Sequence, residues 1–251
     1  MIAACVRRGV AAGCAAGVLA AVFALVFAEP SVDAAIQLEE AHASLAAVLL
    51  VHDTGVGADH HGSSAGLSRS TQKSGLVVGM LIYGAGLGAL FGVAAAWARG
   101  RLRGDAWTRA LKLGASAVLA LVALPALTAP PNPPAVGDPE TVGARTLLFL
   151  GVWAFGLLLA GAAWSGERLL ESRRWSPPAA QTAAGVGVLL ALSALLARLP
   201  ATPGAGAFPG DLLWSFRLAA IATQVVLFGS LAVGYGLLAA RAERSVRAGR
   251  G

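Results

Sequence analysis

Histidine is the residue type that most directly suggests chemistry in this chain, because all four copies fall between residues 42 and 61. Acidic residues share that stretch, and imidazole nitrogens combined with carboxylate oxygens are typical ligands of divalent transition metals. The candidate ligands are Glu39, His42, His52, Asp53, Asp59, His60 and His61. Their spacing matches no closed metal site, so we expect a segment that captures and delivers a metal, with no permanently bound cofactor.

Two other interpretations of this segment stay open: a solvated histidine-rich loop without a specific site, and a pH sensor. Glu39 and His42 favour the metal interpretation, since a spacing of three residues puts both side chains on one face of a helix. The apolar positions within 34–52 predict such a helix, short and amphipathic, inside a polar loop over residues 29–75.

Long apolar segments must position this loop. The chain is 57% hydrophobic and 13% charged, whereas soluble domains are roughly 45–50% apolar and 25% charged. A membrane-spanning helix needs about 20 mostly apolar residues. Six such segments occur, at residues 9–28, 76–98, 107–127, 146–164, 182–199 and 213–240. We therefore predict an all-α polytopic membrane protein, one membrane domain over residues 1–251, in which the 32 glycines allow close helix packing.

Basic residues indicate the orientation of these helices. The N-terminus, the loops after the second and fourth spans and the C-terminal tail hold 14 of the 19 Lys and Arg residues but only four of the 13 acids. Because cytoplasmic segments are enriched in Lys and Arg, both termini are predicted to be cytoplasmic and the histidine loop extracytoplasmic, in the plasma (inner) membrane. The high pI then reflects topology and contact with anionic lipid, not nucleic-acid binding.

The first span has an alternative interpretation. Arg7 and Arg8, the apolar stretch and residues 27–30 (FAEP) resemble a cleaved signal peptide, although the run is long for one. Cleavage there would leave five spans.

Charged residues also flank the later spans. Asp138 precedes Arg145, and Asp211 precedes Arg217, at the predicted outer starts of the fourth and sixth spans. These four residues could form an outer vestibule. The alternative is that Arg217 extends its side chain to the interface and pairs with Asp211.

Catalytic motifs are missing from the sequence. There is no Walker A motif and no evident nucleophile–base pair, and the spans hold few polar residues, such as Ser116 and Gln224. We therefore do not expect an enzyme.

Several segments resemble the CbtA family of predicted cobalt transporter subunits. The matching motifs are residues 7–9 (RRG) before an Ala/Gly/Leu run, 68–76 (SRSTQKSGL), 124–126 (LPA), 131–141 (PNPPAVGDPET) and 209–218 (PGDLLWSFRL). Their order along nearly the whole chain carries the resemblance.

The resemblance implies a membrane subunit for cobalt uptake, linked to cobalamin synthesis. It also implies a small partner, CbtB, with one helix and a histidine-rich end. Ni²⁺ remains an alternative cargo to Co²⁺, because ligand type alone does not separate the two ions. A non-transporting scaffold and a metal or pH sensor remain alternative functions.

Overall fold

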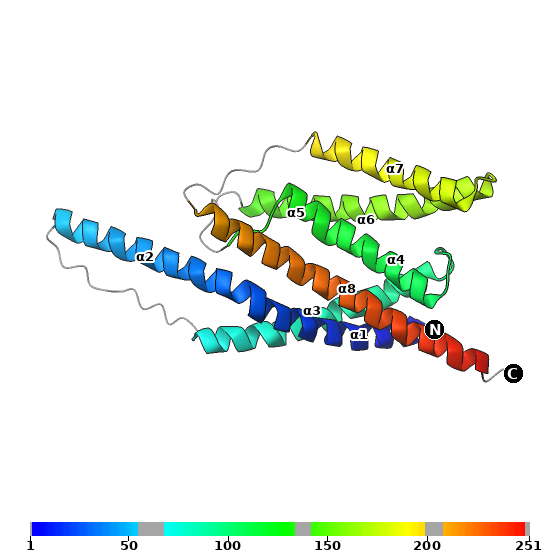
Figure 1. Ribbon diagram of the computed structural model, residues 1–251, viewed down its shortest axis with the longest axis horizontal. Helices are drawn as coiled ribbons and strands as arrows, with labels where there is room; N and C mark the ends of the chain where they lie inside the picture. The colour runs from blue at the N-terminus through cyan, green and yellow to red at the C-terminus, as the bar shows by residue number, and fades with distance from the viewer. Residues whose placement is uncertain (1, 55–67, 134–141, 199–207, 249–251) are drawn as a thin grey trace.

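The computed structural model describes residues 2–54, 68–133, 142–198 and 208–248, which are almost entirely helical and contain no strand. Figure 1 shows the helices as one elongated bundle. The elements are α1 (Ile2–Phe23), η1 (Ala24–Ala28), α2 (Glu29–Thr54), α3 (Arg69–Ala98), α4 (Ala106–Val118), η2 (Leu119–Ala123), α5 (Leu124–Thr128), α6 (Val142–Ser172), α7 (Pro177–Leu196) and α8 (Gly210–Ala248). Within these described ranges, six helical stretches are long and apolar enough to span a membrane, which confirms the predicted number.

The first span differs from its prediction at its far end. The helix does not stop at Ala28 but continues through η1 into α2 and reaches Thr54, so residues 29–54 are helix and not loop. The predicted helix over 34–52 is thus the middle of a longer one. Figure 1 shows α2 projecting beyond the other helices.

A π-helical turn explains how the chain passes Pro30. Proline lacks an N–H and clashes with the carbonyl four residues earlier, which normally ends a helix. Here the wider π turn η1 ends two residues before Pro30, and the π turn η2 ends two residues before Pro125. In both helices the π turn provides the local widening that lets an apolar helix continue past proline.

Glycines hold α1 against α3. Gly9, Gly13 and Gly17 face Gly84, Gly88 and Gly92, and a Cβ atom built on any of these six would overlap the backbone of the facing helix. Such spacing by four residues lets two backbones touch, as in small-residue interfaces in membranes. We call this contact the glycine seam.

The buried core is formed by α1, α3, α4 and α8, with alanines and a few large side chains such as Phe91, Leu227 and Tyr235. Helices α6 and α7 lie at its side and bury little. Cleavage of a leader near Ala28 would remove α1 and expose one face of the glycine seam.

Both termini lie at one end of the bundle, near the α3–α4 loop (Figure 1). We call this the arginine end and the opposite end, from which α2 projects, the histidine end.

Candidate functional site

The predicted metal ligands are distributed along α2 and the segment after it. Glu39 and His42 are exposed residues of α2, and they lie on one face of the helix as predicted. His52 and Asp53 lie near the end of the same helix. Asp59, His60 and His61 lie outside the described residues.

The helix separates these ligands into two groups. His52 follows His42 by ten positions, and at 1.5 Å per residue this is about 15 Å along the axis. Since ligand bonds to transition metals are near 2 Å, one ion cannot contact both His42 and His52 while α2 stays helical. Among the described residues, no group of three or more His, Cys, Asp or Glu side chains is close enough to hold a metal.

An ion-pair cluster, which the sequence analysis missed, fixes the base of α2. Glu29 and Asp33 lie one turn apart, and Arg69 and Lys73 lie one turn apart at the start of α3. Arg69 Nη2 lies 2.7 Å from Glu29 Oε2 and also bonds Asp33, while Lys73 Nζ lies 3.2 Å from Asp33 Oδ2. The Glu29 side chain is only 14% exposed. These bonds join the residues that precede the histidine-bearing segment to the residues that follow it.

The cluster has a signal in the sequence. Two acids spaced i,i+4 precede the histidines, and two bases spaced i,i+4 follow them. Matching these complementary pairs would have predicted that the two segments are paired helices.

Ser31 places the cluster beside α8, since its hydroxyl donates to Ser215 Oγ over 3.4 Å. Ser68 caps α3 by accepting from the Thr71 N–H at 3.2 Å.

Arg217 contacts the segment that follows α5. Its Nη2 donates to Asn132 Oδ1 at 2.8 Å and its Nε to the Pro131 carbonyl at 3.3 Å. Asp211 lies exposed in the first turn of α8. The predicted Arg217–Asp211 pair is not found within the described ranges. Arg145 is half-buried near the start of α6, and Asp138 lies outside the described residues.

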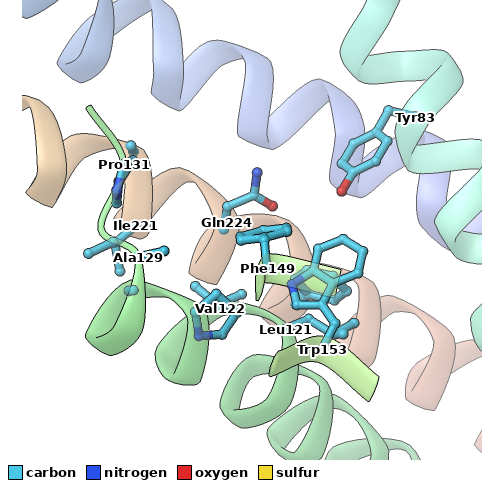
Figure 2. A pocket seen from close by; sticks show the side chains of 13 residues that line it. Tyr83, Leu121, Val122, Ala129, Pro131, Phe149, Trp153, Ile221 and Gln224 are labelled. Atoms are coloured by element: carbon cyan, nitrogen blue, oxygen red, sulfur yellow. The ribbon is translucent and has the colours of Figure 1, made fainter. Parts of the chain in front are cut away.

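A cavity of about 220 Å³ lies in the half of the bundle toward the histidine end. Pro131, held by Arg217, forms part of its rim. Figure 2 shows Tyr83 from α3, Gln224 from α8, and Phe149 and Trp153 from α6 around this space. The Trp153 Nε1 atom is buried and has no hydrogen-bond partner among the described residues.

The chemistry of this cavity is that of an aromatic chamber with few polar groups. Among the described residues, its lining contains no carboxylate or imidazole. A bare divalent ion would lose its hydration there without gaining ligands, at a cost of several kcal/mol or more. The cavity therefore suits a cargo that keeps its own ligand shell, or a path completed by another chain. Sequence reasoning noted Gln224 but missed the three aromatic residues, because aromatics in a span normally indicate packing.

These features define the class: a polytopic α-helical membrane protein with a histidine-bearing helix that projects beyond the bundle and a small cavity within it. The family model for CbtA, described as a probable cobalt transporter subunit, matches residues 2–240. The chain therefore belongs to the CbtA family. Comparisons with curated proteins and with solved structures gave no match.

The family is described as a probable cobalt transporter subunit, which is not an enzyme, and cobalt is the expected cargo. The word subunit also implies a partner chain.

Proposed function

We propose that this chain captures Co²⁺ outside the cell and passes it to a path through the membrane. The observation that carries the proposal is the placement of Glu39 and His42, exposed on the part of α2 that projects beyond the bundle. The arginine-rich distribution supports an extracytoplasmic position for this helix in the plasma (inner) membrane.

Capture would occur in two groups of ligands. Glu39 and His42 form the group nearer the membrane, and the group farther along the chain comprises His52, Asp53, Asp59, His60 and His61. Few protein ligands in each group would give weak, reversible binding, which suits delivery. The ion-pair cluster fixes the start of α2 against α3, so that Glu39 and His42 stay about 15 and 20 Å beyond Glu29 along the helix axis.

Entry would follow the rim formed by Arg217 and Pro131. The charged residues that we propose for this entry are Asp211, Arg145 and Arg217, together with Asp138, which lies outside the described residues. The aromatic cavity beneath them offers no replacement ligands, so the ion would cross hydrated or with ligands from a partner. A small CbtB-like subunit with one helix and a histidine-rich end is the partner we propose.

One observation favours a second candidate, a non-transporting scaffold. Among the described residues, the acids flank the apolar stretches of the spans and none lies within them, whereas a coupled pump normally needs one inside the membrane. A scaffold predicts no flux when this chain and its partner are reconstituted alone. A sensor predicts normal uptake but altered gene regulation after deletion.

The deciding experiment measures cobalt-57 accumulation in cells that lack their own cobalt uptake, expressing this chain with and without the CbtB-like partner. Nickel is the competitor, because it separates the two candidate cargoes. Replacing His42, His52, His60 and His61 by alanine should raise the half-saturating cobalt concentration by about tenfold or more.

The matched control replaces Gln37 and Ser44, exposed on the same helix, by alanine and should leave uptake unchanged. Separate variants of Glu39/His42 and of His52/Asp53 should each give part of the loss. Unchanged uptake in the fourfold histidine variant would rule out the capture role. No uptake by either wild-type combination, with the chain present in the membrane, would favour the scaffold or sensor.

A further inference from the structure

Four arginines gather around one pocket at the arginine end. The pocket has a volume of about 320 Å³, and its lining includes Arg99, Arg101, Arg103, Arg168 and the single carboxylate of Glu171. Glu171 forms an ion pair with Arg103, in which Arg103 Nη1 lies 3.0 Å from Glu171 Oε2. The other three guanidinium groups have no carboxylate partner within the described ranges.

The α3–α4 loop holds these arginines in place. Leu102 is buried in the core, so the neighbouring Arg101 and Arg103 are directed away from it. Gly104 adopts a φ of 109°, which favours glycine, and Asp105 then caps α4. Arg168 on α6 approaches the same loop and donates to the Gly100 carbonyl at 3.3 Å. The charge cluster is thus built by two separate parts of the chain.

An apolar groove lies next to this pocket along α3 and α6, on the side toward the apolar middle of these helices. It has a volume of about 330 Å³ and lies between α3 and α6, which make no extensive contact with each other along these described helices. Leu90 and Trp97 of α3 line one side, Leu157 and Gly161 of α6 the other, and Phe228 of α8 the floor.

Two residue pairs connect the groove with the arginine pocket. The Arg101 guanidinium carbon lies 4.2 Å from the centre of the Trp97 ring, a cation–π contact, and Trp97 lines the groove. On α6, Trp164 lines the groove and Arg168, one turn further, lines the pocket. Tryptophan is typical of the membrane–water interface, so the boundary between apolar and charged surfaces falls where lipid headgroups lie.

We propose that the groove and pocket together bind one anionic phospholipid. Its phosphate diester accepts hydrogen bonds from Arg99, Arg101 and Arg168, and an acyl chain lies in the groove between α3 and α6. Guanidinium groups match phosphate oxygens in geometry and charge. The bound lipid fills the gap that the loose contact between α3 and α6 leaves. A free phosphate compound shares the headgroup chemistry but needs no groove.

The experiment measures lipid binding by native mass spectrometry and by the thermal midpoint of the full chain in neutral detergent. The probes are phosphatidylglycerol, phosphatidylcholine with the same acyl chains, and inorganic phosphate. Phosphatidylglycerol should bind about tenfold more tightly than phosphatidylcholine, because both carry the phosphate diester but only phosphatidylcholine also carries a choline cation, which the arginines repel. The triple variant Arg99→Gln/Arg101→Gln/Arg168→Gln should lose this preference.

The matched control is Arg7→Gln/Arg241→Gln/Arg244→Gln, which removes equal charge from exposed or half-exposed positions outside the pocket. It should keep the preference. Gly161→Leu fills the groove, where a Cβ meets open space, and should weaken phosphatidylglycerol binding. Ala94→Leu narrows the groove from the α3 side and replaces Gly161→Leu as the test of groove binding if that variant misfolds.

An equal loss in the control triple variant, or no preference in the wild type, would overturn the proposal. A second pair of results would also overturn it. If inorganic phosphate stabilised the protein through the arginines, and both groove variants left lipid binding intact, the pocket would be a site for free phosphate.

Discussion

The glycine seam between α1 and α3 and the α6–α7 pair are both helix pairs of the same bundle, but they pack by different means. Along the seam, six glycines bring two backbones into contact, and the α1 residues beside it, such as Ala16 and Ala20, are almost fully buried. Leu158 on α6 and Leu189 on α7 are instead 74% and 65% exposed. Both regions are strongly apolar, so hydrophobicity does not decide which one packs.

The difference shows what holds helices together in lipid. Lipid tails are as apolar as leucine, so burying leucine gains little, whereas small residues allow the close contacts that do stabilise a pair. At Gly156, α6 approaches the π turn η2 closely, since a Cβ there would lie 2.9 Å from Ala120 Cα. The exposed faces of α6 and α7 therefore remain available to lipid or to another subunit.

The largest expected effect comes from closing the seam. Gly88→Leu should prevent folding of the bundle, because overpacking costs about 1–3 kcal/mol even where side chains can adjust, and here the obstacle is the Gly9 backbone. Gly185→Leu on α7, where a Cβ meets nothing within 4 Å, is the control and should fold normally. The yield of monodisperse protein in detergent measures both. Equal yields would mean that the two helix pairs do not differ in packing.

Truncating one leucine in the buried core and one on the exposed face of α6 tests the same difference in packing. Leu227→Ala, at a fully buried position, should lower the free energy of unfolding by about 2–5 kcal/mol through the cavity that it leaves. Leu158→Ala should change it little, because lipid or detergent replaces the lost contacts. Denaturant or thermal unfolding in detergent measures the difference, and a large cost at Leu158 would indicate that a partner or a second copy covers this face.

The ion-pair cluster extends the α1–α3 contact beyond the seam. Arg69→Glu places a third acid beside Glu29 and Asp33, so α2 should separate from α3 and protease should cut near the histidine segment faster. Arg173→Glu, on an exposed residue of the α6–α7 turn, is the control. Asp33→Arg combined with Arg69→Asp should restore protection. If protease cuts the Arg69→Glu variant no faster, the cluster does not hold the two helices together.

The smallest expected effect concerns the start of α4. Hydrogen bonds from the Thr108 side chain and then from its backbone N–H hold the pKa of Asp105 below its usual range. Because the folded-state pKa is the lower one, this stabilisation is present above the unfolded pKa of about 3.9 and is lost as pH falls through the folded value. The thermal midpoint of the wild type should therefore drop slightly more than that of Asp105→Asn between pH 6 and pH 3. Asn caps the helix without titrating.

Much of the fold could be predicted from residue types. The six spans follow from apolar length, and the glycine content already indicated close packing. The end of the first span could not be predicted in this way. Glu29-Pro30 is a strong helix-ending signal, and the π turn that carries the chain past it is a backbone adjustment with no clear sequence mark.

The candidate site was predictable only as a set of ligand types. Residue types alone indicated a segment rich in metal ligands, but only the helix around His42 and His52 shows that one ion cannot reach both. The aromatic cavity and the arginine pocket were not foreseen, because each combines residues far apart in the chain, such as Tyr83 with Trp153 and Arg101 with Arg168.

By itself, the sequence determined that six segments, all within the described ranges, are long and apolar enough to span a membrane, since a helical span satisfies its own backbone hydrogen bonds and depends only on local apolar length. It also determined where metal ligands and basic residues occur. Tertiary structure alone decided which helices touch, because every span is apolar and the choice between them depends on the fit of small residues to a facing backbone. That fit joins α1 to α3 and leaves the groove between α3 and α6.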